Sequence, residues 1–106
     1  MISRVILYMQ DHLRESISVQ QLADMVYVSK SYLSRAFKQK TGLSLMEYLN
    51  SLRMEAAKAL LAASNMNTEE IAYRAGYRST KFFYRAFRAY TGMSTREYRK
   101  NGIDNR

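Results

Sequence analysis

Two short segments of the chain, residues 29–41 and 78–91, contain basic residues and no acidic residue. Their basic residues are Lys30, Arg35, Lys38 and Lys40 in the first segment and Arg78, Lys81, Arg85 and Arg88 in the second. These charges equal the formal net charge of +8 of the whole 106-residue chain, so the remaining residues are neutral as a group. Positive charge confined to two places favours an acidic partner, such as nucleic acid or a membrane surface.

Helical spacing would separate each segment into an apolar and a polar side. The apolar residues, which are expected to be buried, are Tyr32, Leu33, Ala36 and Phe37, and then Phe82, Phe83, Ala86, Phe87 and Tyr90. The outward stripes are Lys30, Ser31, Ser34, Arg35 and Lys38, and then Thr80, Lys81, Tyr84, Arg85 and Arg88. Arginine can bond bidentately to guanine, hydroxyls can meet a base edge or a phosphate, and lysine neutralises phosphate. We therefore predict that Arg35 and Arg85 read bases and that Lys38 and Arg88 contact the DNA backbone.

Both segments belong to an internal repeat. Ser29, Tyr32, Leu33, Arg35, Ala36, Phe37, Lys38, Thr41, Gly42, Ser44, Glu47 and Tyr48 are matched fifty residues later by Ser79, Phe82, Phe83, Arg85, Ala86, Phe87, Arg88, Thr91, Gly92, Ser94, Glu97 and Tyr98. Leu22-Ala23 recurs as Ile71-Ala72 after only forty-nine residues, so the second copy has gained one residue between Ala72 and Ser79. A single basic stripe is more often a solvated helix face, but its repetition favours a recognition surface.

Capping residues and glycines predict the helices that position these stripes. Helices are expected at about 3–14, 19–25, 29–41, 44–63, 79–91 and 95–100, and a further short one begins at Asn67 or Thr68. Expected N-caps include Ser18, Ser29 and Ser79, and expected C-caps are Gly42 and Gly92. The first helix should bury Ile2, Ile6, Met9 and Leu13, and the long one should bury Leu45, Leu49, Leu52, Ala56, Leu60 and Leu61.

In each copy, two helices joined by a short turn form a helix-turn-helix pattern. Ala23 and Ala72 are the small residues that allow the paired helices to approach. Gly76 can supply a positive φ in the second turn, whereas Tyr27 occupies the matching position in the first. We therefore expect the first turn to be less tight. Because Ser31 and Ser34 also reach less far than larger side chains would, we expect the second unit to contribute at least as much DNA affinity as the first.

Composition excludes several classes of protein. The chain has no proline, no cysteine and only four glycines, which favours an all-α fold, and its length suits one folding unit with the aromatic residues other than Tyr84 in the core. With no cysteine and a single histidine, His12, we expect no catalytic, cofactor or metal site and no enzyme. Neither a signal peptide nor a membrane-spanning stretch is found, so a cytoplasmic, nucleoid-associated protein without membrane contact is expected.

Over residues 3–100 the chain resembles the DNA-binding domain of the AraC/XylS family of bacterial transcription regulators. The resemblance rests on Ile71-Ala72, Gly76-Tyr77, Phe82-Phe83, Arg85, Phe87-Arg88, Gly92, Ser94 and Tyr98-Arg99. It implies that residues 1–106 are one DNA-binding domain, in which helix-turn-helix subdomains at 3–43 and 64–100 are joined by a linker helix at 44–63. It further implies that the helices at 29–41 and 79–91 enter adjacent major-groove segments of double-stranded DNA. By position, the base-facing residues that the resemblance implies are Lys30, Ser31, Ser34, Arg35, Thr80, Lys81, Tyr84 and Arg85. RNA polymerase is the expected protein partner.

One alternative function is a basic helical module that binds an acidic protein and no DNA. The chain is either a fragment of a longer regulator or a stand-alone one, and the sequence leaves both open. We expect the isolated domain to be monomeric and a full-length protein to dimerise through a domain outside this chain.

Overall fold

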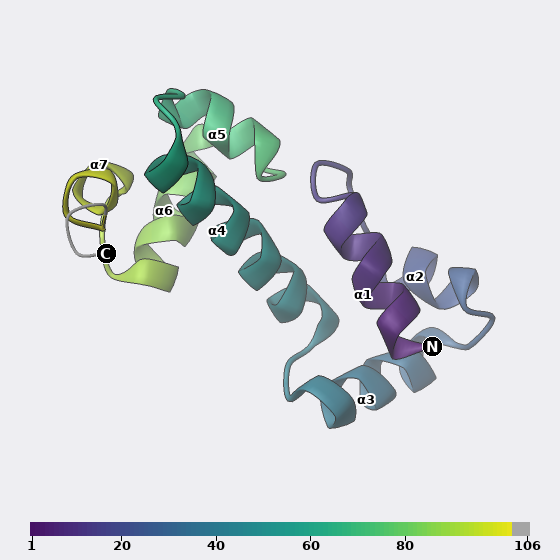
Figure 1. The fold of residues 1–106 in the computed structure, drawn as a ribbon. Helices are drawn as coiled ribbons and strands as arrows, with labels where there is room; N and C mark the ends of the chain where they lie inside the picture. Colours follow the sequence, from purple (N-terminus) through teal and green to yellow (C-terminus); the bar gives the residue numbers. More distant parts are fainter. Residues whose placement is uncertain (103–106) are drawn as a thin grey trace. The chain divides into compact units, whose positions relative to one another are not determined.

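The computed structural model describes residues 1–102, which form seven α-helices and no strand (Figure 1). The helices are α1 (Ile2–Asp11), α2 (Val19–Met25), α3 (Lys30–Thr41), α4 (Leu45–Ala63), α5 (Thr68–Arg74), α6 (Thr80–Thr91) and α7 (Thr95–Glu97), and α7 continues into a π-helical turn at Tyr98–Gly102. The prediction of an all-α fold is confirmed. Within the described residues, no helix combines the length and the hydropathy that a membrane span requires.

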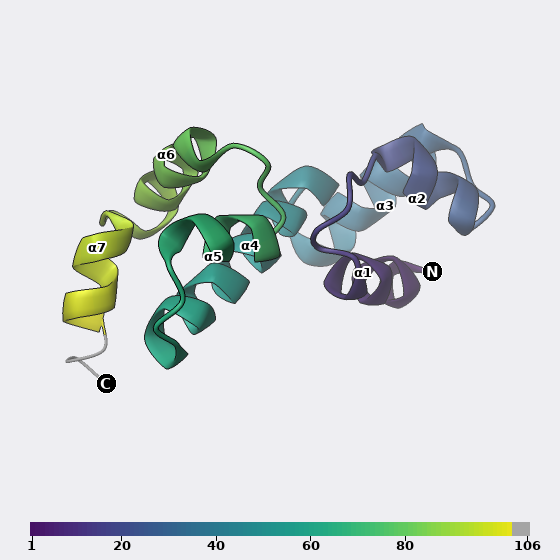
Figure 2. The same ribbon diagram turned by 90° about the horizontal axis from the view of Figure 1, so that it is seen from above.

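The chain divides inside α4 into two compact units, Met1–Leu52 and the described part that begins at Arg53. The helices of each unit can be followed in Figure 2. Each unit has its own cluster of buried apolar residues, so the described residues do not share a single core. A repeat of helix-turn-helix elements thus gives two small cores.

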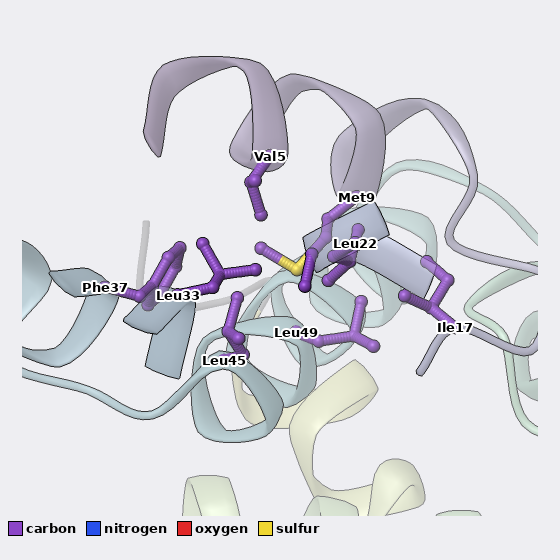
Figure 3. Packing of buried hydrophobic residues seen from close by; sticks show 9 residues of the cluster. Val5, Met9, Ile17, Leu22, Leu33, Phe37, Leu45 and Leu49 are labelled. Atoms are coloured by element: carbon purple, nitrogen blue, oxygen red, sulfur yellow. The ribbon is translucent and has the colours of Figure 1, made fainter. Parts of the chain in front are cut away.

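Helices α1, α2 and α3 and the first half of α4 enclose the first cluster. Its buried members are Val5, Met9, Ile17, Leu22, Ala23, Leu33, Phe37, Leu45 and Leu49. Figure 3 shows the labelled side chains of this cluster pointing toward one another. Because Leu33 and Phe37 are fully buried here, the opposite side of α3 is left to solvent.

The ends of α2 and α3 are determined locally, as predicted. Each of the N-cap residues Ser18 and Ser29 accepts, through its Oγ, a hydrogen bond of 3.0 Å from the backbone N–H three residues further on. Gly42 ends α3 with a φ of 83°, in the left-handed conformation of a C-cap glycine. Ser29 and Gly42 thus fix the two ends of α3, the helix that carries the first polar stripe.

The turn between α2 and α3 is as tight as the turn between α5 and α6, so the prediction of a looser first turn is wrong. Tyr27 has a φ of 61° and Gly76 a φ of 105°, both in the left-handed region. In each turn the following residue donates its N–H to the carbonyl of the small alanine, at 3.1 Å for Ala23 and 2.9 Å for Ala72. The tyrosine can adopt this strained conformation without a steric clash of its ring, since the side chain is 89% exposed.

The additional residue of the second copy is Arg78. Tyr27 lies two residues before the N-cap Ser29, whereas Gly76 lies three residues before the N-cap Ser79. Tyr27 and Val28 correspond to Gly76 and Tyr77. The inserted residue therefore lies directly before the N-cap Ser79. Arg78 is exposed there and adds a positive charge next to the start of α6.

In the second unit, α5, α6, the second half of α4 and Tyr98 of the π-helical turn enclose the other cluster. Its buried members are Met54, Ala57, Leu61, Ile71, Ala72, Ala75, Tyr77, Phe83 and Phe87. Asn67, and not Thr68, caps α5, because its side chain accepts a hydrogen bond of 2.9 Å from the N–H of Glu70. The last helix was expected to reach Lys100 but is α-helical only to Glu97 before it widens into the π-helical turn.

Arg99, in this π-helical turn, holds the end of α4. Its guanidinium donates to the carbonyls of Leu61, Ser64 and Met66 at 3.2, 3.1 and 2.7 Å. Backbone carbonyls at the end of a helix have no partner within the helix, so the arginine supplies donors where they are lacking. Two segments far apart in the sequence are thereby joined within the second unit.

The apolar stripe predicted for α4 is only partly correct. Leu45, Leu49 and Leu61 are buried as predicted, but Leu52, Ala56 and Leu60 are half-buried, and Met54 and Ala57 are buried although the prediction omitted them. The reason is that the first half of α4 contributes to one cluster and the second half to the other. A single periodic stripe cannot describe a helix that serves two cores.

Helix α1 is shorter than predicted, because it ends at Asp11 and not at residue 14. The ring of His12 stacks on that of Tyr8 at 3.9 Å, and its Nδ1 lies 2.8 Å from the Tyr8 carbonyl oxygen. Val5, which the predicted stripe omitted, is fully buried together with Met9. Ile2, Ile6 and Leu13 are only half-buried.

Candidate nucleic-acid interface

The outward side of α3 carries the first predicted stripe. Its members Lys30, Ser31, Ser34, Arg35 and Lys38 are all exposed. Three of them, Ser34, Arg35 and Lys38, also line a surface hollow of about 440 Å³, together with Gln39 and Ser44. Cationic and hydroxyl donors therefore share one accessible surface, as base and phosphate recognition requires.

The outward side of α6 carries the second stripe. Lys81, Tyr84, Arg85 and Arg88 are exposed, whereas Thr80, the first residue of the helix, is half-buried. The buried residues Phe83 and Phe87 occupy the same two positions in α6 as Leu33 and Phe37 in α3. Equivalent packing thus presents equivalent faces in the two copies.

Tyr84 differs from the other residues of its stripe because both ends of its side chain are held. Its ring lies 5.8 Å from that of Phe83, at an interplanar angle of 53°. Its hydroxyl lies 2.8 Å from Oγ1 of Thr68, the first residue of α5. Sequence reasoning considered Thr68 only as a cap and missed this contact, which joins residues sixteen positions apart.

In the second copy, an acidic residue forms an ion pair with the cation that is predicted to contact phosphate. Arg88 forms an ion pair of 3.8 Å with Glu97, and both side chains are more than half exposed. Hydrogen bonds from the backbone and side chain of Ser94 lower the pKa of Glu97, and the positive charge of Arg88 lowers it further. An exposed pair of this kind is weak and readily exchanged for another partner, so the arginine stays available to a phosphate.

The first copy has the same serine–glutamate capping arrangement. Hydrogen bonds from Ser44 lower the pKa of Glu47, with an additional lowering from the charge of Lys38. The carboxylate of Glu47 accepts a hydrogen bond of 2.8 Å from the Ser44 N–H, and the Ser44 Oγ accepts one of 3.1 Å from the Glu47 N–H. Both acids are therefore ionised capping residues that also lie near a cation of the stripe.

Several aromatic residues that were predicted to be buried are exposed. The exposed fractions are 52% for Tyr32, 59% for Phe82 and 41% for Tyr90. Only Leu33 and Phe37 are fully buried in α3, and only Phe83 and Phe87 in α6. The buried face of each helix is therefore narrower than predicted. The Tyr90 hydroxyl instead donates to the Glu55 carboxylate at 2.9 Å. Tyr27 and Tyr73 are likewise exposed and lie outside the core.

A family model described as a helix-turn-helix domain matches residues 22–101. The uncharacterised HTH-type transcriptional regulator YijO of Escherichia coli strain K12 is 32% identical over 93 residues, which cover 88% of this chain and 33% of that protein. The HTH-type transcriptional activator RhaS of Escherichia fergusonii is 35% identical over 99 residues, which cover 93% of this chain and 36% of that protein. The chain thus spans about a third of the length of the curated relatives that it matches.

Solved structures of similar sequence share the fold. The DNA-binding domain of AdpA, a global transcriptional factor solved in complex with a target DNA, is similar with a TM-score of 0.91 and 30% identity, covering 99% of this chain and 95% of that one. The C-terminal domain of AraT, a response regulator from Geobacillus stearothermophilus, is similar with a TM-score of 0.90 and 35% identity, covering 93% of this chain and 83% of that one. Both likenesses take in nearly the whole chain.

Proposed function

Because this chain belongs to the AraC-type helix-turn-helix family of transcription regulators, we propose that it binds specific double-stranded DNA through α3 and α6 and so regulates bacterial transcription. The observation that carries the proposal is the pair of exposed stripes, one on the second helix of each helix-turn-helix unit. In such units the second helix lies in the major groove, where its side chains reach base edges. A stripe of cations and hydroxyls is the chemistry that this position needs.

The residues of each stripe have different roles in the proposed interface. Arg35 and Arg85, near the middle of the stripes, read bases through their guanidinium groups. Lys38 and Arg88, one turn nearer the end of each helix, contact phosphate, and Arg88 gives up its ion pair with Glu97 to do so. The hydroxyl residues Ser31, Ser34 and Thr80 add short-range contacts to base edges or phosphate, and Lys30, Lys81 and Tyr84 complete the interface.

The two units differ in sequence and follow one another in one chain, so the target should not be a palindrome. We expect two unequal elements, about one helical turn of DNA apart, in place of the half-sites that a symmetric dimer reads. Selection from a random duplex library tests this expectation. Recovery of a palindromic site would contradict the tandem arrangement.

A comparison of alanine variants tests the roles of the side chains. Arg35→Ala and Arg85→Ala should each weaken binding to the selected site by about 1–3 kcal/mol and relax specificity locally. Lys38→Ala should weaken binding to selected and random duplexes alike and make the salt dependence less steep. If all three variants weaken both kinds of duplex equally, the division of roles is wrong.

The rival function, a basic module that binds an acidic protein, predicts a different result. It gives no footprint on any duplex, whereas DNA binding makes the logarithm of affinity fall linearly with the logarithm of salt concentration. Binding measured at several salt concentrations therefore separates the two functions before any target is known.

Properties of a full-length regulator extend the proposal. RNA polymerase is the protein partner that transcription regulation calls for, and the cytoplasm, with its nucleoid, is the place where the DNA lies. A co-purification with RNA polymerase on a selected site tests the partner. The isolated chain should run as a monomer in sedimentation, since each unit closes its own core.

A further inference from the structure

We propose that Thr68 is a positioning residue for DNA readout by the second unit and that it acts through Tyr84. The observation is the hydrogen bond of 2.8 Å between Oγ1 of Thr68 and the hydroxyl oxygen of Tyr84. It connects the first residue of α5 with the outward face of α6, the two helices of one helix-turn-helix unit. The inference rests on the proposed function, because it assigns a role within the DNA interface.

Two contacts fix the side chain of Tyr84 before any ligand arrives. The ring lies against that of Phe83, which is fully buried, and the hydroxyl is hydrogen-bonded to Thr68. Tyrosine has only two side-chain torsions, so these contacts leave it little freedom to lose on binding. Lys81 and Arg85 beside it must instead order long, exposed side chains.

The hydroxyl pair also determines what Tyr84 can offer to a ligand. Either hydroxyl can donate in the hydrogen bond, and Tyr84 then keeps a free donor if Thr68 donates or a free acceptor if Tyr84 donates. Tyr84 is 39% exposed, so part of this residue remains accessible to a ligand. A neutral phenol combines a hydrogen-bonding group with an apolar edge, which suits a base pair in the major groove better than a phosphate.

The first unit has no such pair. Val19 occupies the position in α2 that Thr68 occupies in α5, and Ser34 occupies the position of Tyr84. A valine offers no hydroxyl, and a serine is too short to reach across to the other helix. The positioning contact therefore belongs to the second unit alone and makes its readout more rigid than that of the first.

The experiment measures affinity for a selected duplex and for duplexes in which each base pair of the second element is changed in turn. Thr68→Val keeps the size of the side chain and removes the hydroxyl, while Asn67 still caps α5. It should weaken binding to the selected duplex about threefold to tenfold, the usual worth of one hydrogen bond. Discrimination should fall at the same base pair as in Tyr84→Phe, and binding to random duplexes should stay unchanged.

Three further variants make the test specific. Thr68→Val combined with Tyr84→Phe should cost no more than Tyr84→Phe alone, because both remove the same contact. Thr68→Ser should retain wild-type discrimination, since the hydroxyl is kept. Thr91→Val deletes a hydroxyl of the same unit that bonds to the Phe87 carbonyl, and it should lower thermal stability without changing base preference.

The inference is overturned if Thr68→Val discriminates among the duplexes as the wild type does, or if the two single effects add fully in the double variant. If Thr68→Val fails to fold, Thr68→Ala and Tyr84→Phe provide the same comparison. A wild-type chain that binds selected and random duplexes equally would instead refute the proposed function, and with it this role of Thr68.

Discussion

Replacement of Tyr27 by glycine should stabilise the first unit. The residue holds a φ of 61°, and a left-handed conformation costs a residue with a Cβ about 1–2 kcal/mol. Glycine removes this cost but gives back about 0.4–1 kcal/mol, because the unfolded chain becomes more flexible. Since the side chain is 89% exposed, little apolar burial is lost. The difference between these two ranges is about 0–1.6 kcal/mol, so the expected net gain in the free energy of unfolding is centred on about 0.8 kcal/mol.

Urea denaturation, followed by circular dichroism, measures this gain. Tyr27→Ala is the matched control, because it removes the exposed ring and keeps the Cβ and the strain, so its stability should change little. Gly76→Ala is the reciprocal change, since it adds a Cβ at a φ of 105° and should destabilise by about 1–3 kcal/mol. If Tyr27→Gly is less stable than Tyr27→Ala, backbone strain in the first turn is not what limits its stability.

Three further predictions concern the cores and the caps. Arg99→Ala should lower the free energy of unfolding by about 2–3 kcal/mol, because three backbone carbonyls lose a charged donor. The control is Arg96→Ala, a change at an exposed residue nearby, which should alter stability by no more than about 0.5 kcal/mol in the same urea titration. Phe87→Ala should cost about 3–5 kcal/mol and reduce amide hydrogen-exchange protection first in α5 and α6; earlier loss in α1 and α2 would contradict two separate cores. The pKa of Glu97 lies below its ordinary value of 4.5. Its contribution to stability is therefore present above pH 4.5 and is lost as the pH falls through the lowered pKa. In acid titrations, Glu97→Gln should lose less stability than the wild type over this pH range.

Those parts of the fold that depend on neighbouring residues in the sequence could be predicted. The N-caps Ser18, Ser29 and Ser79 act through the backbone only three residues away, so a short pattern contains the whole interaction. Nine of the ten predicted site residues are exposed, as the same periodicity predicts, and only Thr80 departs from it. What the residues contact in DNA stays a prediction.

Features that depend on tertiary packing could not be predicted. The left-handed Tyr27 contradicts the usual preference of a residue with a side chain, because the turn imposes the conformation. Exposure of Tyr32 and Phe82 results from how wide a face of each helix the core can cover, which the sequence does not state. The contact of Thr68 with Tyr84 depends on how closely α5 approaches α6.

Helix α4 contributes buried residues to both clusters, and this has a consequence for the way the chain folds. In arrays of repeated units, overall stability is the sum of the stability of each unit and of the interaction between neighbours. Here the neighbour interaction is the shared helix itself, because Leu45 and Leu49 stabilise one half of α4 and Met54, Ala57 and Leu61 the other. Loss of either core removes the packing from half of this helix. The two repeats should therefore fold cooperatively. When one core is lost, the length of α4 that remains helical measures how strongly the folding of one repeat favours the folding of the other.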